Sequence, residues 1–195
     1  MPLKLNTVKE VLLDSKVIAF PTETVMGLGV VFDDYSAYKL LNEIKRRPEE
    51  KPYTMMLSDI EEIEKYAFTT ERDKKIIREF MPGPITLLLK SKTNVPGYVT
   101  HETGIIGIRV PNIDFVREMI RFVGKPLLVP SANRSGEKPF IKASDVKKEF
   151  GDELGYIVME DALGEKPSTI VDLTSENVKI IREGPISYQE IERIL

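Results

Sequence analysis

Cysteine is absent from this chain, and its absence excludes several kinds of chemistry. A protein without thiols forms no disulfide, binds no metal through thiolates and has no cysteine nucleophile. Histidine is almost absent: the single one, His101, lies in the polar stretch 100–104, and a lone loop histidine predicts neither a metal site nor a general base. We therefore expect no metal-binding residues and assign His101 no role.

Long apolar runs are also lacking. The first sixteen residues, MPLKLNTVKEVLLDSK, contain no continuous apolar segment of the kind that signal peptides carry. No later stretch approaches the roughly 20 apolar residues that span a bilayer. With the absence of cysteine, this predicts a soluble, cytoplasmic protein without a membrane partner.

An excess of positive charge is missing, because 28 basic and 31 acidic side chains leave a formal net charge of -3. A nucleic-acid-binding domain usually carries a basic surface, so any anion must be bound here by a local cluster. The familiar phosphate loops are missing too, and Gly27-Leu-Gly29 is only a fragment of a dinucleotide-binding turn. We expect no tightly bound cofactor.

What the chain does contain is enough apolar sequence for a core, since 42% of its 195 residues are hydrophobic. This size predicts one domain, residues 1–195. Helical periodicity predicts helices over 6–16, 33–45, 58 onward, 70–80, 112–123, 144–150 and from 187. Short β-rich runs predict strands over 17–20, 25–32, 53–57, 85–90, 105–110, 127–129, 156–159, 169–173 and 178–182. The mixed order predicts an α/β fold, with a twisted open sheet of mixed direction flanked by helices.

Several helix ends carry capping signals. Asn6 or Thr7 is expected to cap the first helix and Asp33 or Asp34 the second. Capping boxes are predicted at Ser58-x-x-Glu61 and Ser187-x-x-Glu190.

A basic cluster, Lys45, Arg46, Arg47 and Lys51, follows the second predicted helix. One interpretation is a solvated helix end, whose positive charge the helix dipole favours. The other is a polyphosphate clamp, because guanidinium groups bind phosphate oxygens in a bidentate fork and ammonium groups add compact charge. The cluster alone leaves both open.

Three polar loops follow or interrupt apolar strands, at 21–24, 130–136 and 167–169. Each alone is typical of a turn, but small polar groups at strand ends also line the binding crevice of an open sheet. Arg109 and Arg182 lie in or after strands, where a partly buried arginine needs a carboxylate or an anion. We expect that partner to be Glu23, Asp172 or Glu183. Without a thiol or a serine–histidine pair, catalysis would rest on positioning and charge stabilisation.

Taken in order, these motifs resemble the YrdC-like family, which includes the threonylcarbamoyl-adenylate synthases of transfer-RNA modification. The resemblance spans nearly the whole chain and comprises FPTETVMGLG at 20–29, Lys45-Arg46-Arg47 with Lys51-Pro52, PGPITLLL at 82–89, GIRVP at 107–111, PSANRSG at 130–136, PSTIVDLT at 167–174 and REG at 182–184. It implies a twisted mixed sheet around a central basic cavity, in a minimal form without the C-terminal extension of the two-domain synthases.

The activity implied by the resemblance condenses L-threonine, bicarbonate and ATP, with Mg²⁺ accompanying the nucleotide, to threonylcarbamoyl-AMP and pyrophosphate. A downstream threonylcarbamoyl-transferase complex then uses the product, and contact with tRNA or double-stranded RNA is expected. By position in the motifs, the resemblance implies that Lys45 and Arg47 are catalytic. It places Arg47, Lys51, Asn133 and Arg182 at ATP, and it places Thr24, Met56, Arg109, Ser131 and Ser168 at threonine and the carbamate.

This sequence departs from the family pattern around the implied threonine pocket. Met26 stands where synthases usually have tyrosine, Met56 replaces a usual histidine, and Ile105 replaces a common threonine. The segment YTMMLSD at 53–59 is closer to the YciO branch. Two alternatives therefore stay open. One is an RNA-binding or ribosome-maturation protein that makes no adenylate, and the other is an adenylating enzyme with a different substrate.

Overall fold

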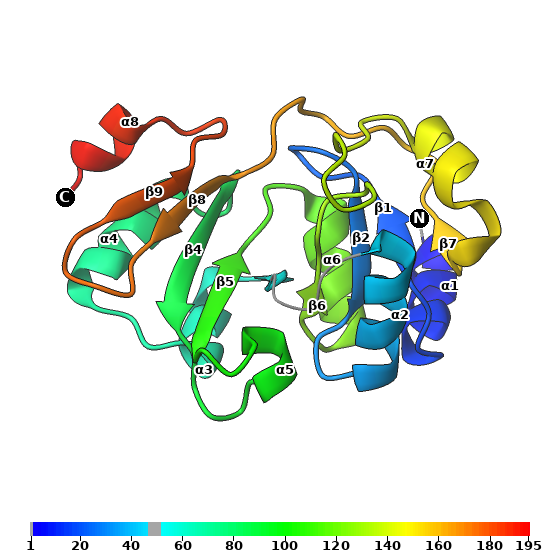
Figure 1. Cartoon of the computed structure of the whole chain (residues 1–195), viewed down its shortest axis with the longest axis horizontal. Coiled ribbons are helices and arrows are strands. Elements are labelled where there is room, and N and C mark those ends of the chain that lie inside the picture. The colour runs from blue at the N-terminus through cyan, green and yellow to red at the C-terminus, as the bar shows by residue number, and fades with distance from the viewer. Residues whose placement is uncertain (1, 47–51) are drawn as a thin grey trace.

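The computed structural model describes residues 2–46 and 52–195, in which strands and helices are interspersed (Figure 1). The strands are β1 (Ile18–Phe20), β2 (Gly27–Val31), β3 (Thr54–Met56), β4 (Ile85–Lys90), β5 (Ile105–Arg109), β6 (Leu127–Leu128), β7 (Tyr156–Ile157), β8 (Thr169–Asp172) and β9 (Lys179–Arg182). The helices are α1 (Pro2–Leu13), α2 (Tyr35–Lys45), α3 (Ile63–Tyr66), α4 (Glu71–Phe80), α5 (Gly97–Thr100), α6 (Asp114–Val123), α7 (Ala143–Phe150) and α8 (Tyr188–Glu192). Short 3-10 helices cover Ile60–Glu62 and Gly151–Glu153.

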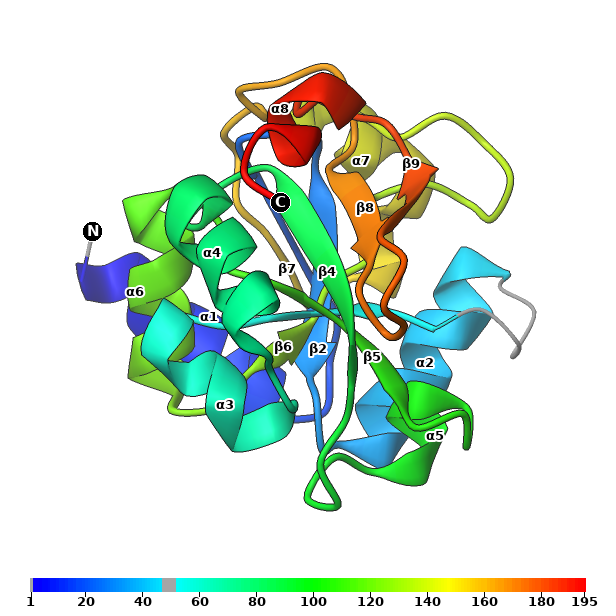
Figure 2. The same cartoon turned by 90° about the vertical axis from the view of Figure 1, so that its left-hand side faces the viewer.

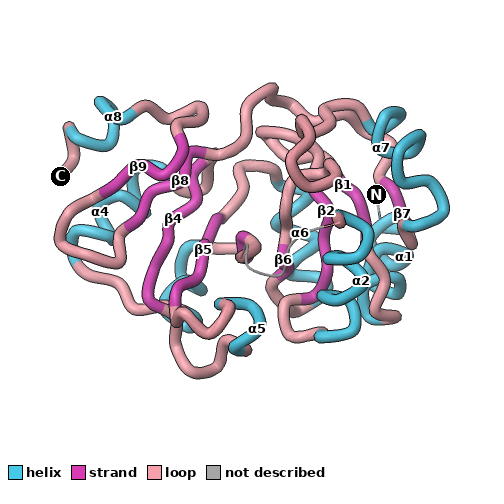
Figure 3. Tube along the Cα trace, in the orientation of Figure 1, coloured by secondary structure: helices cyan, strands magenta, loops and turns pink. Residues whose placement is uncertain are grey.

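The strands form one sheet in the order β7-β1-β2-β6-β3-β5-β4-β8-β9. Three neighbouring pairs are parallel, β7 with β1, β3 with β5 and β4 with β8, and the other five are antiparallel. The predicted α/β fold with a mixed sheet flanked by helices is therefore confirmed. Figure 3 shows how long loops join many of these short strands.

Helices cover both faces of the sheet, as a sheet buried on both sides requires. Figure 2 shows α1, α3, α4 and α6 to one side of the strands and α2 and α5 to the other. An apolar cluster joins α1 and α6 to the strands through Leu12, Phe20, Met119 and Leu127. Within the described parts of the chain, no helix is both long enough and apolar enough to cross a membrane.

Local signals located most helix ends but not all of them. Asp34 caps α2 by accepting the N–H of Ala37, and Ser187 forms the predicted capping box with Glu190. The box predicted from Ser58 to Glu61 is wrong: the Ser58 hydroxyl donates to Glu62 instead, at 2.6 Å, and a 3-10 helix begins at Ile60.

The start of the first helix was also predicted wrongly. Asn6 and Thr7 lie inside α1, which begins at Pro2, a residue that suits a first helical turn because its missing N–H would have no partner there. The short helix α5 carries no helical periodicity and was not predicted.

Strand register brings together side chains that are far apart in the sequence. The parallel pairing of β3 with β5 sets Thr54 beside Gly107 and Met56 beside Arg109. Residues paired across neighbouring strands point to the same face of a sheet. Met56 and Arg109 therefore face the same space, into which the polar loops also turn.

Candidate active site

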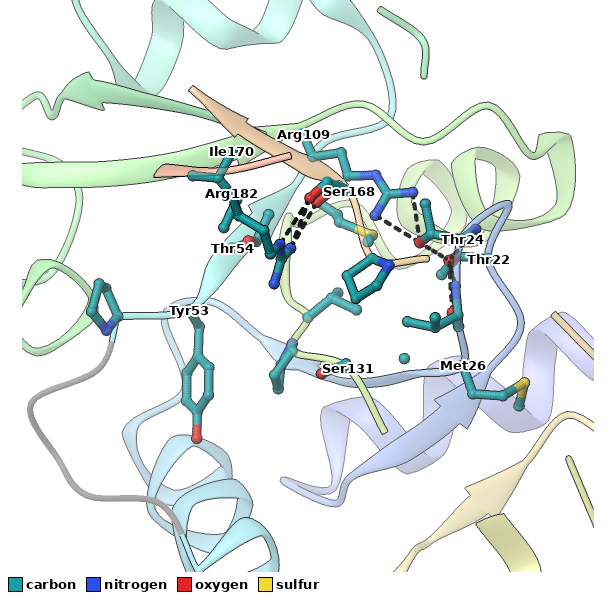
Figure 4. A pocket seen from close by; sticks show the side chains of 17 residues that line it. Thr22, Thr24, Met26, Tyr53, Thr54, Arg109, Ser131, Ser168, Ile170 and Arg182 are labelled. Atoms are coloured by element: carbon teal, nitrogen blue, oxygen red, sulfur yellow. Dashed lines mark hydrogen bonds between the residues drawn. The ribbon is translucent and has the colours of Figure 1, made fainter. Parts of the chain in front are cut away.

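A cavity of about 160 Å³ lies where the predicted polar loops meet the sheet (Figure 4). Its wall is built by the loop between β1 and β2, the strands β3 and β5, the segment after β6, the loop before β8, and the end of β9. Of the residues proposed from the sequence, the cavity is lined by Thr24, Met56, Arg109, Ser131, Ser168 and Arg182. The fold thus gathers six of these side chains, although the sequence separates the first from the last by more than 150 positions.

Arg109, at the end of β5, is a buried charge that a carboxylate and a hydroxyl hold in the cavity wall. Its side chain is 5% exposed and forms an ion pair with Glu23, at 2.9 Å. Both terminal nitrogens also donate to the Thr24 hydroxyl, at 3.1 Å each. The other oxygen of Glu23 accepts the backbone N–H of Asn112, at 2.8 Å. The expected carboxylate partner of Arg109 is therefore Glu23, and the guanidinium plane is fixed from two sides.

The threonine turn opposite Arg109 is ordered by its own hydroxyls. Thr22 Oγ1 accepts the N–H groups of Thr24 and Val25, at 3.1 and 3.2 Å, and lies 2.7 Å from the Val25 carbonyl, to which it donates. Thr24 Oγ1 receives two N–H donors from Arg109, which use both of its lone pairs. Its hydroxyl hydrogen is left for a ligand, because Thr22 Oγ1, 2.8 Å away, already accepts two N–H groups. This side of the cavity therefore offers hydrogen-bond donors, which suit a carboxylate.

A second guanidinium approaches from β9. Arg182 donates through Nε and a terminal nitrogen to the carbonyl of Ser168, at 3.0 and 2.9 Å. The Ser168 hydroxyl in turn lies 2.9 Å from Thr86 Oγ1 on β4. Burial, and secondly repulsion from Arg109, lower the pKa of Arg182. Within residues 2–46 and 52–195 neither Asp172 nor Glu183 pairs with Arg182, and its hydrogen bonds go to Ser168.

The REG motif ends in glycine because the backbone at Gly184 leaves no room for a side chain. A Cβ at this position would lie 2.3 Å from the Pro167 carbonyl and 2.6 Å from the Thr169 nitrogen. The chain after Arg182 must therefore pass directly against the loop that carries Ser168. A larger residue would separate the two sides of this wall.

The 131–135 loop forms another wall and is held by Lys45 from α2. Lys45 is 1% exposed, and its ammonium group donates to the carbonyls of Ser131 and Asn133, at 2.6 and 2.7 Å. The interpretation of this lysine as part of a solvated helix end is therefore wrong. Lys45 does not line the cavity, so the structure shows it holding the loop, and its predicted catalytic role stays a prediction.

Asn133 also lies behind the cavity wall. Its amide nitrogen donates to the carbonyls of Arg134 and Glu137, and its oxygen accepts the Ser131 hydroxyl, at 2.6 Å. In this conformation the side chain shapes its own loop, and its contact with ATP stays a prediction. Arg47 and Lys51, the other predicted ATP ligands, lie outside the described residues.

Sequence reasoning gave no role to three further polar lining residues, Thr22, Tyr53 and Thr54, although Thr22 belongs to the polar loop 21–24. Thr54 precedes Met56 by two positions on β3, so the alternation of a strand could have placed both on the cavity face. The departures from the family pattern fall partly here: Met26 and Met56 line the cavity, whereas Ile105 does not. In the described residues no group of three or more acidic or histidine side chains could hold a metal.

Known proteins resemble this chain along nearly all of its length. The sequence model of the Sua5/YciO/YrdC family, described as "Telomere recombination", matches residues 10–184. A threonylcarbamoyl-AMP synthase of Photorhabdus laumondii is 36% identical over 174 residues, which are 87% of this chain and 90% of that protein. The chain belongs to the Sua5/YciO/YrdC family.

Solved structures agree with this membership. Pyrococcus abyssi Sua5, crystallised with L-threonine, is 29% identical, superimposes with a TM-score of 0.96 and is matched by 100% of this chain. The chain spans 58% of that Sua5 chain. Escherichia coli YciO is 25% identical, with a TM-score of 0.91 and coverage of 98% of this chain and 94% of YciO. The fold of this chain is therefore the fold of these Sua5 and YciO structures.

Proposed function

We propose that this protein is an L-threonylcarbamoyladenylate synthase, which converts L-threonine, bicarbonate and ATP to threonylcarbamoyl-AMP, pyrophosphate and water. Family membership and the naming of a 36% identical relative support the reaction. The observation that carries it in the structure is the pair of arginines on one small cavity. Arg109 is neutralised by Glu23, whereas within the described parts of the chain Arg182 pairs with no carboxylate, donates to Ser168 and is proposed to bind an anion.

The size of the cavity divides the substrates between two regions. Pockets for drug-sized ligands measure roughly 300–1,000 Å³. At about 160 Å³ this cavity suits an amino acid and its carbamate, but not a whole nucleotide. We place threonine against the hydrogen-bonded pair of Thr24 and Arg109, with Ser131 and Ser168 directing the carbamate. ATP then extends outward past Arg182 and the 131–135 loop, with Arg47 and Lys51 as its further proposed ligands.

The reaction proceeds in two bond-forming steps. The threonine amine joins the bicarbonate carbon with loss of water, and the resulting carbamate oxygen attacks the α-phosphorus of ATP. The bond from the α-phosphorus to the bridging oxygen breaks, and its electron pair leaves with pyrophosphate. Because negative charge grows on the phosphate oxygens, a fixed guanidinium such as Arg182 lowers the barrier. The chain supplies orientation and charge, and no covalent intermediate with a side chain is needed.

Mg²⁺ accompanies ATP in this proposal. Magnesium keeps several waters and is usually bound through phosphate oxygens and one or two carboxylates, so a dedicated cage of protein ligands is not required. The product is a mixed anhydride, which an amine can attack. A second protein complex is proposed to use it for acyl transfer to an adenosine beside the anticodon of tRNA.

Pyrophosphate release tests the proposal directly. The purified protein is given ATP, Mg²⁺ and bicarbonate with one amino acid at a time: threonine, serine, valine or none. Release that requires both threonine and bicarbonate supports the synthase. Release with another amino acid only would indicate an adenylating enzyme with a different substrate, and no release with any would contradict the proposal.

The dependence of RNA binding on salt concentration tests the alternative, an RNA-binding protein that makes no adenylate. Binding through the nucleic-acid backbone weakens steeply with salt because counterions are released. The net charge of -3 does not favour it. Tight, salt-sensitive RNA binding by a protein that releases no pyrophosphate would establish this alternative.

A further inference from the structure

Arg134 is a buried arginine that lies just behind the cavity wall and does not itself line the cavity. It follows Asn133 in the 131–135 loop and is 6% exposed. A charge this well buried needs partners. Its contacts lead away from the cavity, toward the ends of two helices.

Two carboxylates hold Arg134 from the outer side. Its Nε donates to Glu149 at 2.7 Å, and its terminal nitrogens donate to the two oxygens of Glu153 at 2.5 and 3.1 Å. The hydrogen bond that Arg134 donates to Glu153 is the largest cause that raises the pKa of Arg134. The guanidinium also stacks over the Phe150 ring, 4.5 Å from its centre. These partners belong to α7 and the 3-10 helix after it, so Arg134 ties its loop to that segment.

The inner side of Arg134 completes the end of α2. The last carbonyls of a helix have no partner within the helix. Here a terminal nitrogen of Arg134 donates to the carbonyl of Ile44, and the N–H of Ser135 donates to the carbonyl of Lys45, at 2.8 Å. Lys45 returns two hydrogen bonds to the loop, to the carbonyls of Ser131 and Asn133. The helix end and the loop are therefore bound to each other in both directions.

We propose that Arg134 is a positioning residue for the synthase reaction, which fastens the 131–135 loop between the end of α2 and the Glu149–Glu153 segment. The inference rests on the proposed function for its kinetic consequence, but the fastening itself is independent of it. Ser131 forms part of the cavity wall, and Asn133 keeps the Ser131 hydroxyl in place. When Arg134 is removed, the loop loses its outer attachment. Ser131 then moves relative to Arg109 and Arg182, and displacements of about 1 Å at such a site reduce turnover by up to roughly a hundredfold.

The test compares Arg134→Met with a matched control, Arg72→Met. Arg72 is also partly buried, and it pairs with Asp73 and donates to the carbonyls of Leu173, Ser175 and Glu176, none of which lines the cavity. Both substitutions keep most of the side-chain stem and remove one paired charge. A further variant, Glu149→Gln with Glu153→Gln, weakens the outer attachment without changing the loop. Arg134→Lys restores the charge with fewer hydrogen bonds.

Two readouts are measured on each folded variant. The structural readout is amide hydrogen exchange of the 130–136 segment. The functional readout is ATP affinity together with the KM and kcat of pyrophosphate release. We expect Arg134→Met to exchange faster in this segment and to lose at least about tenfold in ATP affinity or kcat/KM. The glutamine double variant should change in the same direction, Arg134→Lys should recover part of the loss, and Arg72→Met should leave both readouts unchanged.

Unchanged hydrogen exchange in the 130–136 segment would contradict the proposal that Arg134 holds the 131–135 loop in place. Faster exchange with unchanged ATP affinity and turnover would overturn the positioning role, because the attachment would then serve stability alone. Hydrogen exchange does not require catalysis. If the wild-type protein releases no pyrophosphate, the proposed function fails, while exchange and ATP affinity still decide the role of Arg134.

Discussion

Replacing Glu23 with glutamine tests the ion pair on which the Arg109 side of the cavity depends. The Arg109 side chain is 5% exposed and that of Glu23 is 13% exposed, so both charges of the pair are largely removed from water. Glutamine keeps the size of the side chain and can still accept the Asn112 N–H, but it removes the negative charge. The buried guanidinium is then left with the Thr24 hydroxyl as its neutral partner.

The expected loss of folding stability in Glu23→Gln follows from the burial of this ion pair. Removing one partner of a buried pair destabilises a protein by about 3–5 kcal/mol, because a charge stays buried without compensation. Since two neutral hydrogen bonds remain, we expect the lower end, about 3 kcal/mol. For a chain of this length each 1 kcal/mol lowers the melting temperature by roughly 2–4 °C, so the expected shift is about 6–12 °C.

The assay is chemical denaturation followed by circular dichroism, with the free energy of unfolding taken from curves of equal slope. The matched control is Asp33→Asn, which breaks the exposed pair of Asp33 and Lys125, whose side chains are 35% and 48% exposed. Exposed pairs contribute about 0–1 kcal/mol, so this variant should be nearly neutral. A Glu23→Gln protein as stable as the Asp33→Asn protein would refute the reasoning, because Arg109 would then be compensated without Glu23.

Other predictions concern the cavity and its surroundings. Met56→His should raise the ratio of kcat/KM for threonine over valine by about five- to tenfold, because an imidazole restores a polar contact that a thioether barely makes; a parent already strongly selective would contradict this. Arg182→Gln should lower kcat/KM for ATP by roughly tenfold to a hundredfold with little change in melting temperature, and an unchanged value would remove Arg182 from the site. Hydrogen bonding to Arg134 lowers the pKa of Glu153 below its ordinary value of 4.5, so its stabilising effect is present above that pH and is lost as the pH falls through the lowered pKa. The fall in melting temperature in acid should be shallower in Glu153→Gln, and identical pH profiles would contradict the assignment.

The sequence predicted those parts of the fold that depend on neighbours along the chain. Asp34 and the pair Ser187 and Glu190 cap their helices as expected, because a cap needs only residues within one turn. The same reasoning from neighbouring residues predicted the wrong partner for Ser58. Two glutamates follow this serine in succession, and the geometry of the 3-10 helix selects Glu62 rather than Glu61. The mixed sheet followed from the order of elements, whereas its strand order did not.

The candidate site was predictable in its residue types but not in its contacts. Arg109 needed a carboxylate, and the sequence offered three, but only the fold selects Glu23. Lys45 and Arg134 belong to motifs that lie far apart in the sequence, with the 82–89 and 107–111 motifs between them. Their hydrogen bonds cross about 90 positions of the chain, and no local pattern encodes such a contact. Periodicity could have added Thr54, which shares a strand face with Met56.

The most direct test of the central claim is the identity of the product. The protein is incubated with ATP, Mg²⁺, threonine and isotopically labelled bicarbonate, and the nucleotides are analysed by mass spectrometry. The synthase predicts an adenylate that carries threonine and the labelled carbon together, and that is absent when either threonine or bicarbonate is withheld. Consumption of ATP without such an adenylate, or an adenylate that lacks the label, would contradict the claim.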